Sequence, residues 1–343
     1  MTLGGESGGA QAISTRAAVL AAVLTASAPA AAAAAEEEMT GWLREHDNVG
    51  VVLQTTNDLF GDFGDKYLTA SGFLAASIPD ASGRIERAIG APGVGFVAAG
   101  LTFYTPLDKE SLVPPPDDRP YAAYGFITAG AIALRDSANR VTQDRAALEI
   151  GATGSFLLAD EIQNGLHDFI GSEPVNGWDT QVPTEVYGAV RGERAWRNFT
   201  GFAGETFEVA PFAGATLGTS ETSAVIGLDI AYGEDIGRNA FWRDRATGAR
   251  VIVAEAAARP GWRWRVGAGV DATLVVHDAT LDGGFFASGR DVAKTPVRWR
   301  LRFGGEIANG LWALGYDFAL LGPEYDDQDQ IQAIGALTLR ASF

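Results

Sequence analysis

The strongest chemical signal in the sequence is a histidine with an amide and a carboxylate at short spacing. His167 is one of three histidines in 343 residues and lies in the segment EIQNGLHDFIGSE, residues 161–173. Gln163 precedes it by four positions and Glu173 follows it by six. A carboxylate beside an imidazole orients its tautomer and raises its basicity, as a general base requires. The segment is therefore a candidate acid–base site, and the simpler alternative is a surface histidine on a loop helix.

The same segment predicts a short helix. Asp160 suits the N-cap, Gln163 then stands where a capping box places its amide, and Gly171 suits the C-terminal end. Gln163 and His167 would share one helix face because they are four residues apart. Glu173 lies just past the helix, and its carboxylate could fold back toward the imidazole.

Other catalytic chemistry has little support. The chain has no cysteine, no G-x-S-x-G nucleophile elbow and no H-E-x-x-H metal helix. His46 and His277 do not stand at metal-ligand spacing from His167. The glycine-rich run GAPGVG lacks the lysine of a phosphate-binding loop and is more typical of a turn.

The N-terminus predicts export. Arg16 is followed by a short apolar run and then by small residues of the A-x-A kind, as in a secretory signal peptide. We expect residues 1–35 to be the leader, cleaved near Ala35, and residues 36–343 to form one domain. After the leader there is no apolar run of the length that a membrane helix needs. The net charge of −17 argues against nucleic acid as a partner.

The rest of the chain alternates with a period of two. In WRWRVGAGVDATL, residues 262–274, tryptophans and aliphatic residues alternate with arginine, glycine and aspartate. In VRWRLRF, residues 297–303, apolar residues alternate with three arginines. The strands are long and carry aromatic residues near their ends, which indicates apolar faces toward lipid and arginines toward a polar interior. We predict an all-β transmembrane antiparallel barrel that ends in Phe343, and the alternative is a secreted β-sandwich.

Twelve strands are expected. They are 48–58, 66–77, 93–106, 120–134, 145–157, 183–193, 204–216, 222–233, 261–277, 293–307, 310–321 and 331–343. A further apolar run, VIVAEAAA at 251–258, would make the number odd, whereas bacterial single-chain barrels have even numbers. We therefore assign it to a periplasmic connection, with a helical turn as one form that it could take.

Strand parity brings the polar clusters together. If the first strand runs outward, then the connections at 57–69, 106–120 and 158–182 are all extracellular. Asn57 and Asp58 end the first strand, Thr69 starts the second, and His167 follows the fifth. The sequence thus predicts that these residues share one rim of the barrel, with a short helix in an extracellular loop.

Several short motifs occur in order between about residues 46 and 190. They are Asn57-Asp58, then Asp65, Tyr67, Thr69 and Gly72, then Tyr104 to Pro106, Asp118 to Ala122, Gln163 with His167 and Glu173, Gly177-Trp178 with Gln181, and Glu185. Taken together, this order resembles the outer-membrane lipid A 3'-O-deacylase family, of the LpxR type. The resemblance implies a twelve-stranded barrel in the outer membrane of a Gram-negative bacterium.

The resemblance also implies a chemistry, which is calcium-dependent hydrolysis of the ester that holds the 3'-linked acyloxyacyl group on lipid A. His167 would be the general base for a water, and Asp58 would hold Ca²⁺. The remaining residues implied at the site are Asn57, Thr69, Gln163, Glu173 and Lys109, the last as the candidate lysine of the second extracellular loop. Arg119 either contacts lipid A phosphates or is structural, paired with Asp117 or Asp118. The partners would be lipopolysaccharide and outer-membrane lipid, and the alternative function is a non-enzymatic barrel, either an adhesin or a small channel.

Overall fold

The computed structural model describes residues 49–61, 66–80, 82–137, 140–202, 205–255 and 260–343. The leader predicted at residues 1–35 lies outside the described residues, as does Asp65.

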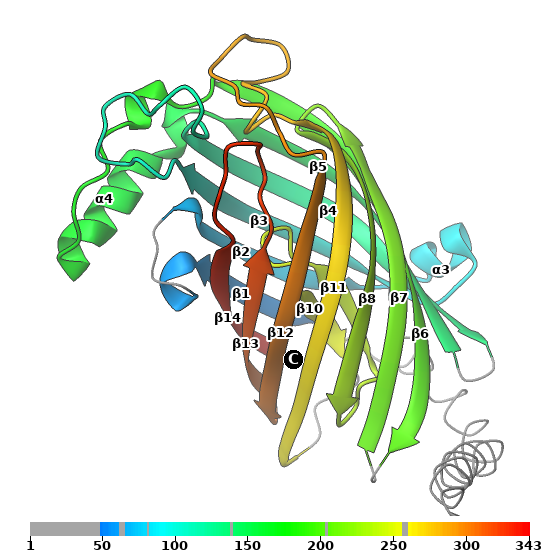
Figure 1. The fold of residues 1–343 in the computed structure, drawn as a ribbon. Coiled ribbons are helices and arrows are strands. Elements are labelled where there is room, and N and C mark those ends of the chain that lie inside the picture. The colour runs from blue at the N-terminus through cyan, green and yellow to red at the C-terminus, as the bar shows by residue number, and fades with distance from the viewer. Residues whose placement is uncertain (1–48, 62–65, 81, 138–139, 203–204, 256–259) are drawn as a thin grey trace, which may run out of the picture.

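Twelve antiparallel strands close into one barrel (Figure 1), as the sequence predicts. The strands are β1 (Gly50–Asn57), β2 (Tyr67–Pro79), β3 (Gly93–Thr105), β4 (Ala122–Ser137), β5 (Arg140–Thr153), β6 (Glu185–Phe202), β7 (Glu205–Gly218), β8 (Glu221–Gly233), β11 (Trp262–Asp278), β12 (Val297–Asn309), β13 (Trp312–Leu321) and β14 (Gln332–Ser342). Each strand pairs with its neighbour in the chain, except that β8 pairs with β11, and β1 closes the barrel on β14.

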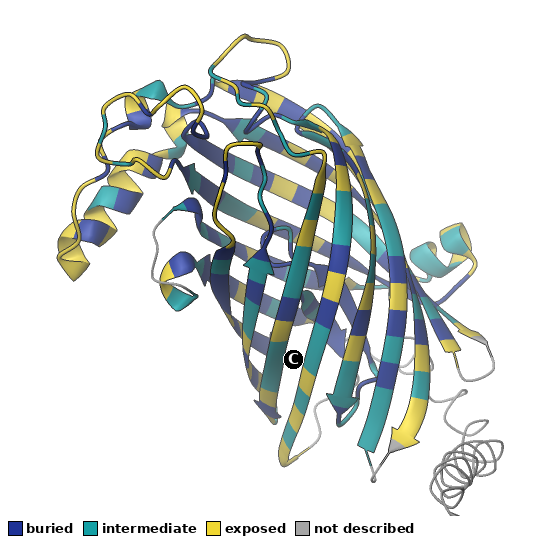
Figure 2. Cartoon of the chain, in the orientation of Figure 1, coloured by how far each residue is buried: buried dark blue, intermediate teal, exposed yellow. Residues whose placement is uncertain are grey.

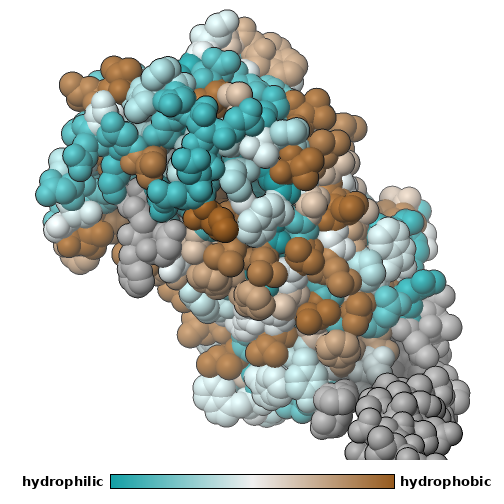
Figure 3. Space-filling model, viewed as in Figure 1, coloured by the Kyte–Doolittle hydropathy of each residue, from teal (hydrophilic) through white to brown (hydrophobic). Residues whose placement is uncertain are grey.

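The two faces of the strands separate as the alternation predicts. On β11, Trp262 is 72% exposed on the outer face, whereas Arg265 on the inner face binds Glu306 of β12. Figure 2 shows the resulting alternation of buried and exposed residues along the strands. The predicted polar interior lined by arginines is thus confirmed, and the brown areas of the barrel wall in Figure 3 show its apolar exterior.

The connection between β8 and β11 folds into the barrel. It forms a separate two-stranded sheet of β9 (Asn239–Arg243) and β10 (Arg250–Glu255). Trp242 of this hairpin packs on Phe73 and Phe96 of the wall, with ring centroids 4.9 and 5.6 Å apart. The helical turn expected for 251–258 is therefore wrong for residues 251–255, because the apolar residues of the strand are buried in the lumen; residues 256–258 lie outside the described part.

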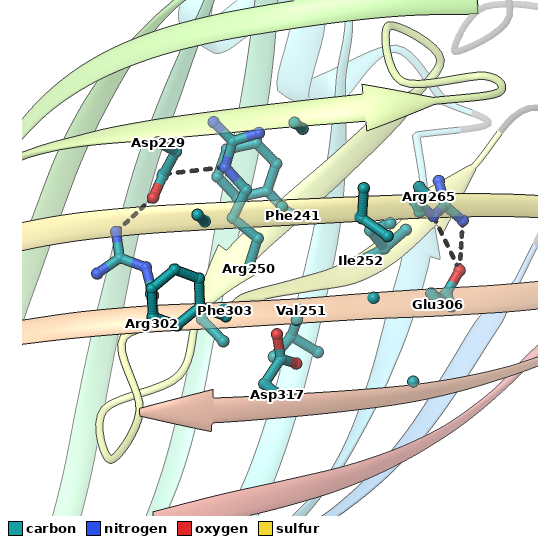
Figure 4. Close-up of a pocket in the computed structure, with 18 of the residues that line it drawn as sticks. Asp229, Phe241, Arg250, Val251, Ile252, Arg265, Arg302, Phe303, Glu306 and Asp317 are labelled. Atoms are coloured by element: carbon teal, nitrogen blue, oxygen red, sulfur yellow. Dashed lines mark hydrogen bonds and ion pairs between the residues drawn. The ribbon is translucent and has the colours of Figure 1, made fainter. Parts of the chain in front are cut away.

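Ion pairs fix this hairpin to the wall. Arg250 contacts Glu208 at 3.0 Å and Asp229 at 2.9 Å, and Arg243 also contacts Asp229 at 3.0 Å. Figure 4 shows Asp229 and Arg250 beside a cavity of about 110 Å³, which lies between the hairpin and the strands of the wall. The lumen is thus a packed, charge-paired interior.

The barrel has two rims that carry different structures. We call the rim where β1 begins and β14 ends the terminal rim, and the opposite rim the loop rim. Helix α3 (Arg84–Ile89) lies at the terminal rim, while α4 (Ala159–Ile170) and the 3-10 turns η1 (Asp58–Phe60), η2 (Ser155–Leu157) and η3 (Trp178–Thr180) lie at the loop rim. β5 ends at Thr153 and not at 157, because the chain turns through η2. No helix among the described residues is long and apolar enough to cross a membrane.

Candidate active site

Helix α4 carries the candidate base on its buried face. Ala159, Gln163 and His167 are its buried residues, which confirms that the last two share a face. The predicted C-terminal end is also confirmed, because Gly171 adopts φ 75° and its N–H donates to the His167 carbonyl. The predicted N-cap is wrong. The helix begins one residue before Asp160, and the N-cap position is Leu158, whose left-handed backbone follows from the turn of η2.

The turn after α4 orients the imidazole. Nδ1 of His167 lies 2.6 Å from the main-chain oxygen of Glu173. A carbonyl can only accept, so Nδ1 carries the proton and Nε2 keeps its lone pair. The Glu173 carboxylate is exposed and does not take the partner role expected of it, because the chain reverses after Gly171 and presents its backbone to the ring.

Asn164 holds that turn in place. Its side chain accepts a hydrogen bond from the Val175 N–H at 2.8 Å and donates one to the Val175 carbonyl at 3.0 Å. These two bonds tie the segment that contains Glu173 to the helix that contains His167. The sequence motifs did not predict this role, because Asn164 lies between the motif positions Gln163 and His167.

A tryptophan docks α4 on the outer wall of the barrel. Trp178 donates from Nε1 to Oε1 of Gln163 at 3.0 Å. Its ring packs on Tyr121 and Phe103, with centroids 5.0 and 6.0 Å apart. Phe103 belongs to the outer face of β3, so Gln163 is buried between the helix and the wall rather than exposed on a loop.

A β-bulge shapes the wall near this helix. The register between β2 and β3 shifts between Leu68 and Ala70, so Thr69 is the extra residue. Leu68 packs in the lumen, while Ala70 packs with the cluster on the outer wall. Bulges redirect side chains, and here the hydroxyl of Thr69 lies 2.6 Å from that of Thr105. Thr105 occurs in one of the sequence motifs but was given no role there.

Asn57 and Asp58 form a turn at the end of β1, next to this wall. Oδ1 of Asn57 accepts from the Leu59 N–H at 2.7 Å, and Asn57 pairs across the ladder with Ala70. Asp58 is buried, and its Oδ2 accepts from the Lys66 N–H at 2.6 Å. Strand parity therefore predicted correctly that these residues reach the same rim as α4.

The donors near β1 and β2 are oxygen atoms, the ligand type that calcium prefers. They include the Asp58 carboxylate and the Thr69 hydroxyl, so their chemistry fits a calcium ion. Within the described residues no three His, Cys, Asp or Glu side chains form a group that could hold a metal. Among the described residues, a cation here would therefore need neutral oxygen atoms in addition to at most two such side chains.

The loop between β3 and β4 contacts the chain around α4. The Lys109 carbonyl accepts from the Tyr121 hydroxyl at 3.2 Å and from the Asn176 N–H at 3.1 Å. The Lys109 side chain is half-buried. Lys109 thus lies in the layer that covers the outer wall beside α4. This position is compatible with its predicted place in the site.

Arg119 is a structural residue. It is fully buried, pairs with Glu324 at 2.6 Å and lies over the Tyr104 ring at 4.1 Å. Neither Asp117 nor Asp118 forms a side-chain ion pair with it, although its main-chain N–H donates to the Asp118 carboxylate at 2.8 Å. The alternative in which Arg119 contacts lipid A phosphates is wrong because the guanidinium is enclosed. Asp118 also accepts from the Tyr325 hydroxyl, and burial together with this bond raises the pKa of that phenol.

The lumen cavities are separate from this site. The residues that line the cavity of Figure 4 come from the hairpin and the inner wall, and His167 is not among them. A lumen closed by ion pairs does not admit a membrane lipid, whereas the outer wall faces the membrane directly. We therefore assign the candidate site to the outer wall.

Comparison with known proteins decides the family. The family model described as outer membrane protein LpxR matches residues 18–343. The chain belongs to this family. This is the same family that the sequence motifs resemble. A search of the curated proteins found no match.

Solved structures agree with the fold. LpxR from Salmonella typhimurium superposes with a TM-score of 0.72 at 19% identity, covering 85% of this chain and 99% of that one. The β domain of the Bordetella autotransporter Brka gives a TM-score of 0.45 at 9% identity, covering 86% of this chain and 98% of that one. Only the first is similar enough to support the twelve-stranded fold.

Proposed function

We propose that this LpxR-family barrel is a lipid A deacylase of the outer membrane. It hydrolyses the ester that holds the 3'-linked acyloxyacyl group. The observation that carries the proposal is His167, buried on a helix docked against the outer wall, with Nδ1 committed to a main-chain carbonyl. A lipid substrate lies in the membrane plane, so a site on the outer wall near a rim can meet it directly.

In this proposal the Nε2 lone pair of His167 takes a proton from a water as its oxygen attacks the ester carbonyl. The tetrahedral oxyanion then collapses and expels the sugar oxygen, which receives the proton from the imidazolium. Thr69 and Asn57 orient the water and the ester, Gln163 and Glu173 position the histidine, and Lys109 stabilises the oxyanion. No serine nucleophile is required.

Asp58 is the residue that would hold a calcium ion, with neutral oxygens such as that of Thr69 beside it. When bound, the ion would supply positive charge that polarises the ester carbonyl. We place the loop rim on the extracellular side, where lipid A forms the outer leaflet. The channel alternative is weakened because the β9–β10 hairpin occupies the lumen.

Replacing the base tests the proposal. His167→Ala should slow loss of the 3'-linked acyl group by roughly 10²- to 10⁴-fold, the usual contribution of a general base. The measurement is mass spectrometry of lipid A extracted from a Gram-negative host that expresses the protein. The control is Asp168→Ala, which changes the exposed next residue of the same helix and should keep full activity.

Unchanged deacylation by a folded His167→Ala barrel would remove the assigned base. No deacylation by the unchanged protein, in hosts that differ in lipid A structure, would favour the non-enzymatic barrel.

A further inference from the structure

Helix α4 exposes an apolar stripe next to the face that it buries. The buried face holds Ala159, Gln163 and His167. At 3.6 residues per turn, three exposed apolar residues fall on one adjoining side of the helix, and a fourth, exposed in the last turn, lies at the edge of the buried face. They are Ile162, Leu166, Phe169 and Ile170, and Phe169 is 86% exposed. Such a stripe next to a protein contact is unusual for a loop helix surrounded by water.

The opposite side of α4 is acidic. Asp160, Glu161 and Asp168 are all exposed there, together with half-buried Asn164. The helix therefore has three sectors: one against the barrel wall, one apolar and exposed, and one acidic. Helices that lie in the plane of a membrane also divide into an apolar sector in the acyl chains and a charged sector in water, although their charges are usually basic and those of α4 are acidic.

The apolar stripe continues the outer wall of the barrel. Leu148 and Ile150 of β5 are exposed on that wall, and the chain then runs through exposed Phe156 and Leu158 directly into α4. Apolar residues thus follow one another from strand to helix, with Ser155 as the one exposed polar residue between Ile150 and Leu158.

The height of α4 fits a membrane interface. On the outer face near the terminal rim, Asp144 pairs with Arg194, which marks the polar edge of the wall there. From Asp144 to Thr153 the strand is about 30 Å long at roughly 3.3 Å per residue, and a tilt of about 40° leaves roughly 23 Å along the barrel axis. Since the apolar band of such barrels is about 25 Å tall, the start of α4 lies at its other edge.

We propose that α4 is an in-plane membrane helix whose stripe of Ile162, Leu166, Phe169 and Ile170 inserts among the acyl chains of the leaflet at the loop rim. The occupant is lipid hydrocarbon, because the stripe is continuous with the lipid-facing wall and lies opposite an acidic sector. This placement does not depend on the proposed ester hydrolysis.

The absence of cysteine makes a direct test possible. Single variants Phe169→Cys, Glu161→Cys and Ile150→Cys are labelled with an environment-sensitive fluorophore, and the full barrel is refolded into phospholipid vesicles. Nitroxide-bearing acyl chains and aqueous iodide serve as the two quenchers. Ile150 on the wall is the reference for lipid contact, and Glu161 on the acidic sector is the reference for water.

The label at 169 should be quenched by nitroxide lipid nearly as strongly as the label at 150, and at least about fivefold more than the label at 161, at a depth of roughly 5–10 Å below the headgroups. Equal iodide quenching at 169 and 161 would show a helix in water and overturn the proposal. Protection of 169 from both quenchers would show that protein covers the stripe, which also overturns it. Because no step measures deacylation, a failure here is distinct from a failure of the proposed function.

Discussion

His167 has one ring nitrogen committed to a main-chain carbonyl, so in the proposed mechanism the other nitrogen acts as the base. A carbonyl partner fixes the tautomer without adding a charge to the site. The orientation of the imidazole therefore depends on the position of a turn rather than on one acidic side chain. In the proposed mechanism, residues that hold this turn would therefore position the base.

Asn164 should act as such a positioning residue. Asn164→Ala removes both hydrogen bonds to Val175, which frees the turn and the Glu173 carbonyl. We expect kcat for deacylation to fall by about 10- to 100-fold, as when an orienting partner of a functional histidine is lost. KM should change little, because Asn164 lies on the side of α4 away from the wall.

The matched control is Glu161→Ala, an exposed change on the same helix that should leave kcat unaltered. A rise in KM alone for Asn164→Ala would assign the residue to substrate binding instead of to positioning.

The calcium hypothesis makes a separate prediction at the residue scale. Asp58→Asn keeps an oxygen that can accept from the Lys66 N–H but removes one charge. Since ligand charge sets calcium affinity, the calcium concentration for half-maximal deacylation should rise by at least about tenfold. Asp80→Asn, on the short connection at the terminal rim, should cause no rise. Full deacylation in excess chelator would remove the cation from the mechanism.

At the scale of elements, an aromatic cluster anchors helix α4 on the outer wall. Trp178 joins the helix, through Gln163, to the strands, through Phe103 and Tyr121. The strands below are held by continuous ladders of main-chain hydrogen bonds, whereas α4 is held to the wall by this small cluster. Such local packing makes the helix the part of the site that can loosen without unfolding of the barrel.

Trp178→Phe tests this anchor. Phenylalanine keeps an aromatic ring against Phe103 and Tyr121 but loses the hydrogen bond to Gln163. Loss of one partner from a buried bond costs roughly 1–3 kcal/mol. We expect faster amide hydrogen exchange over residues 159–170 and unchanged exchange in β2 and β3. Asp179→Asn, an exposed neighbour, should alter neither; faster exchange throughout the barrel in the Phe variant would contradict a local role.

At the scale of the whole molecule, the lumen is an ion-paired core built around a hairpin. Arg197 and Arg250 both bind Glu208, and Arg250 and Arg302 both bind Asp229. Each carboxylate thus binds arginines from both the wall and the hairpin. Removing one arginine leaves buried carboxylates with fewer partners, so these pairs should matter more than pairs on the outside.

Arg250→Ala should destabilise the barrel by about 3 kcal/mol, the usual scale for breaking a buried pair. Arg194→Ala removes an arginine that is 52% exposed and bound to Asp144, and should lower the unfolding midpoint far less because solvent screens this pair. The measurement is the denaturant midpoint of tryptophan fluorescence for the refolded barrel. Equal midpoints for the two variants would show that the hairpin does not brace the wall.

The sequence alone determined that the chain forms a barrel and that the candidate site residues lie at one rim of it. Period-two alternation is a local property, so twelve strands, their faces and their order could be predicted from neighbouring residues. Strand parity then placed Asn57, Asp58, Thr69 and His167 on one rim without any contact being known. The face shared by Gln163 and His167 followed from helix periodicity in the same way.

Only the tertiary structure decided what depends on residues far apart in the chain. Arg119 meets Glu324, 205 positions away, and no local pattern could name that partner. The direction in which the β9–β10 hairpin folds depends on packing inside the closed barrel. The choice of the Glu173 carbonyl over its carboxylate depends on how the turn after α4 is braced. Alternation of apolar and polar residues indicates which face of a strand a side chain occupies. Contacts between distant segments form only once the barrel has closed.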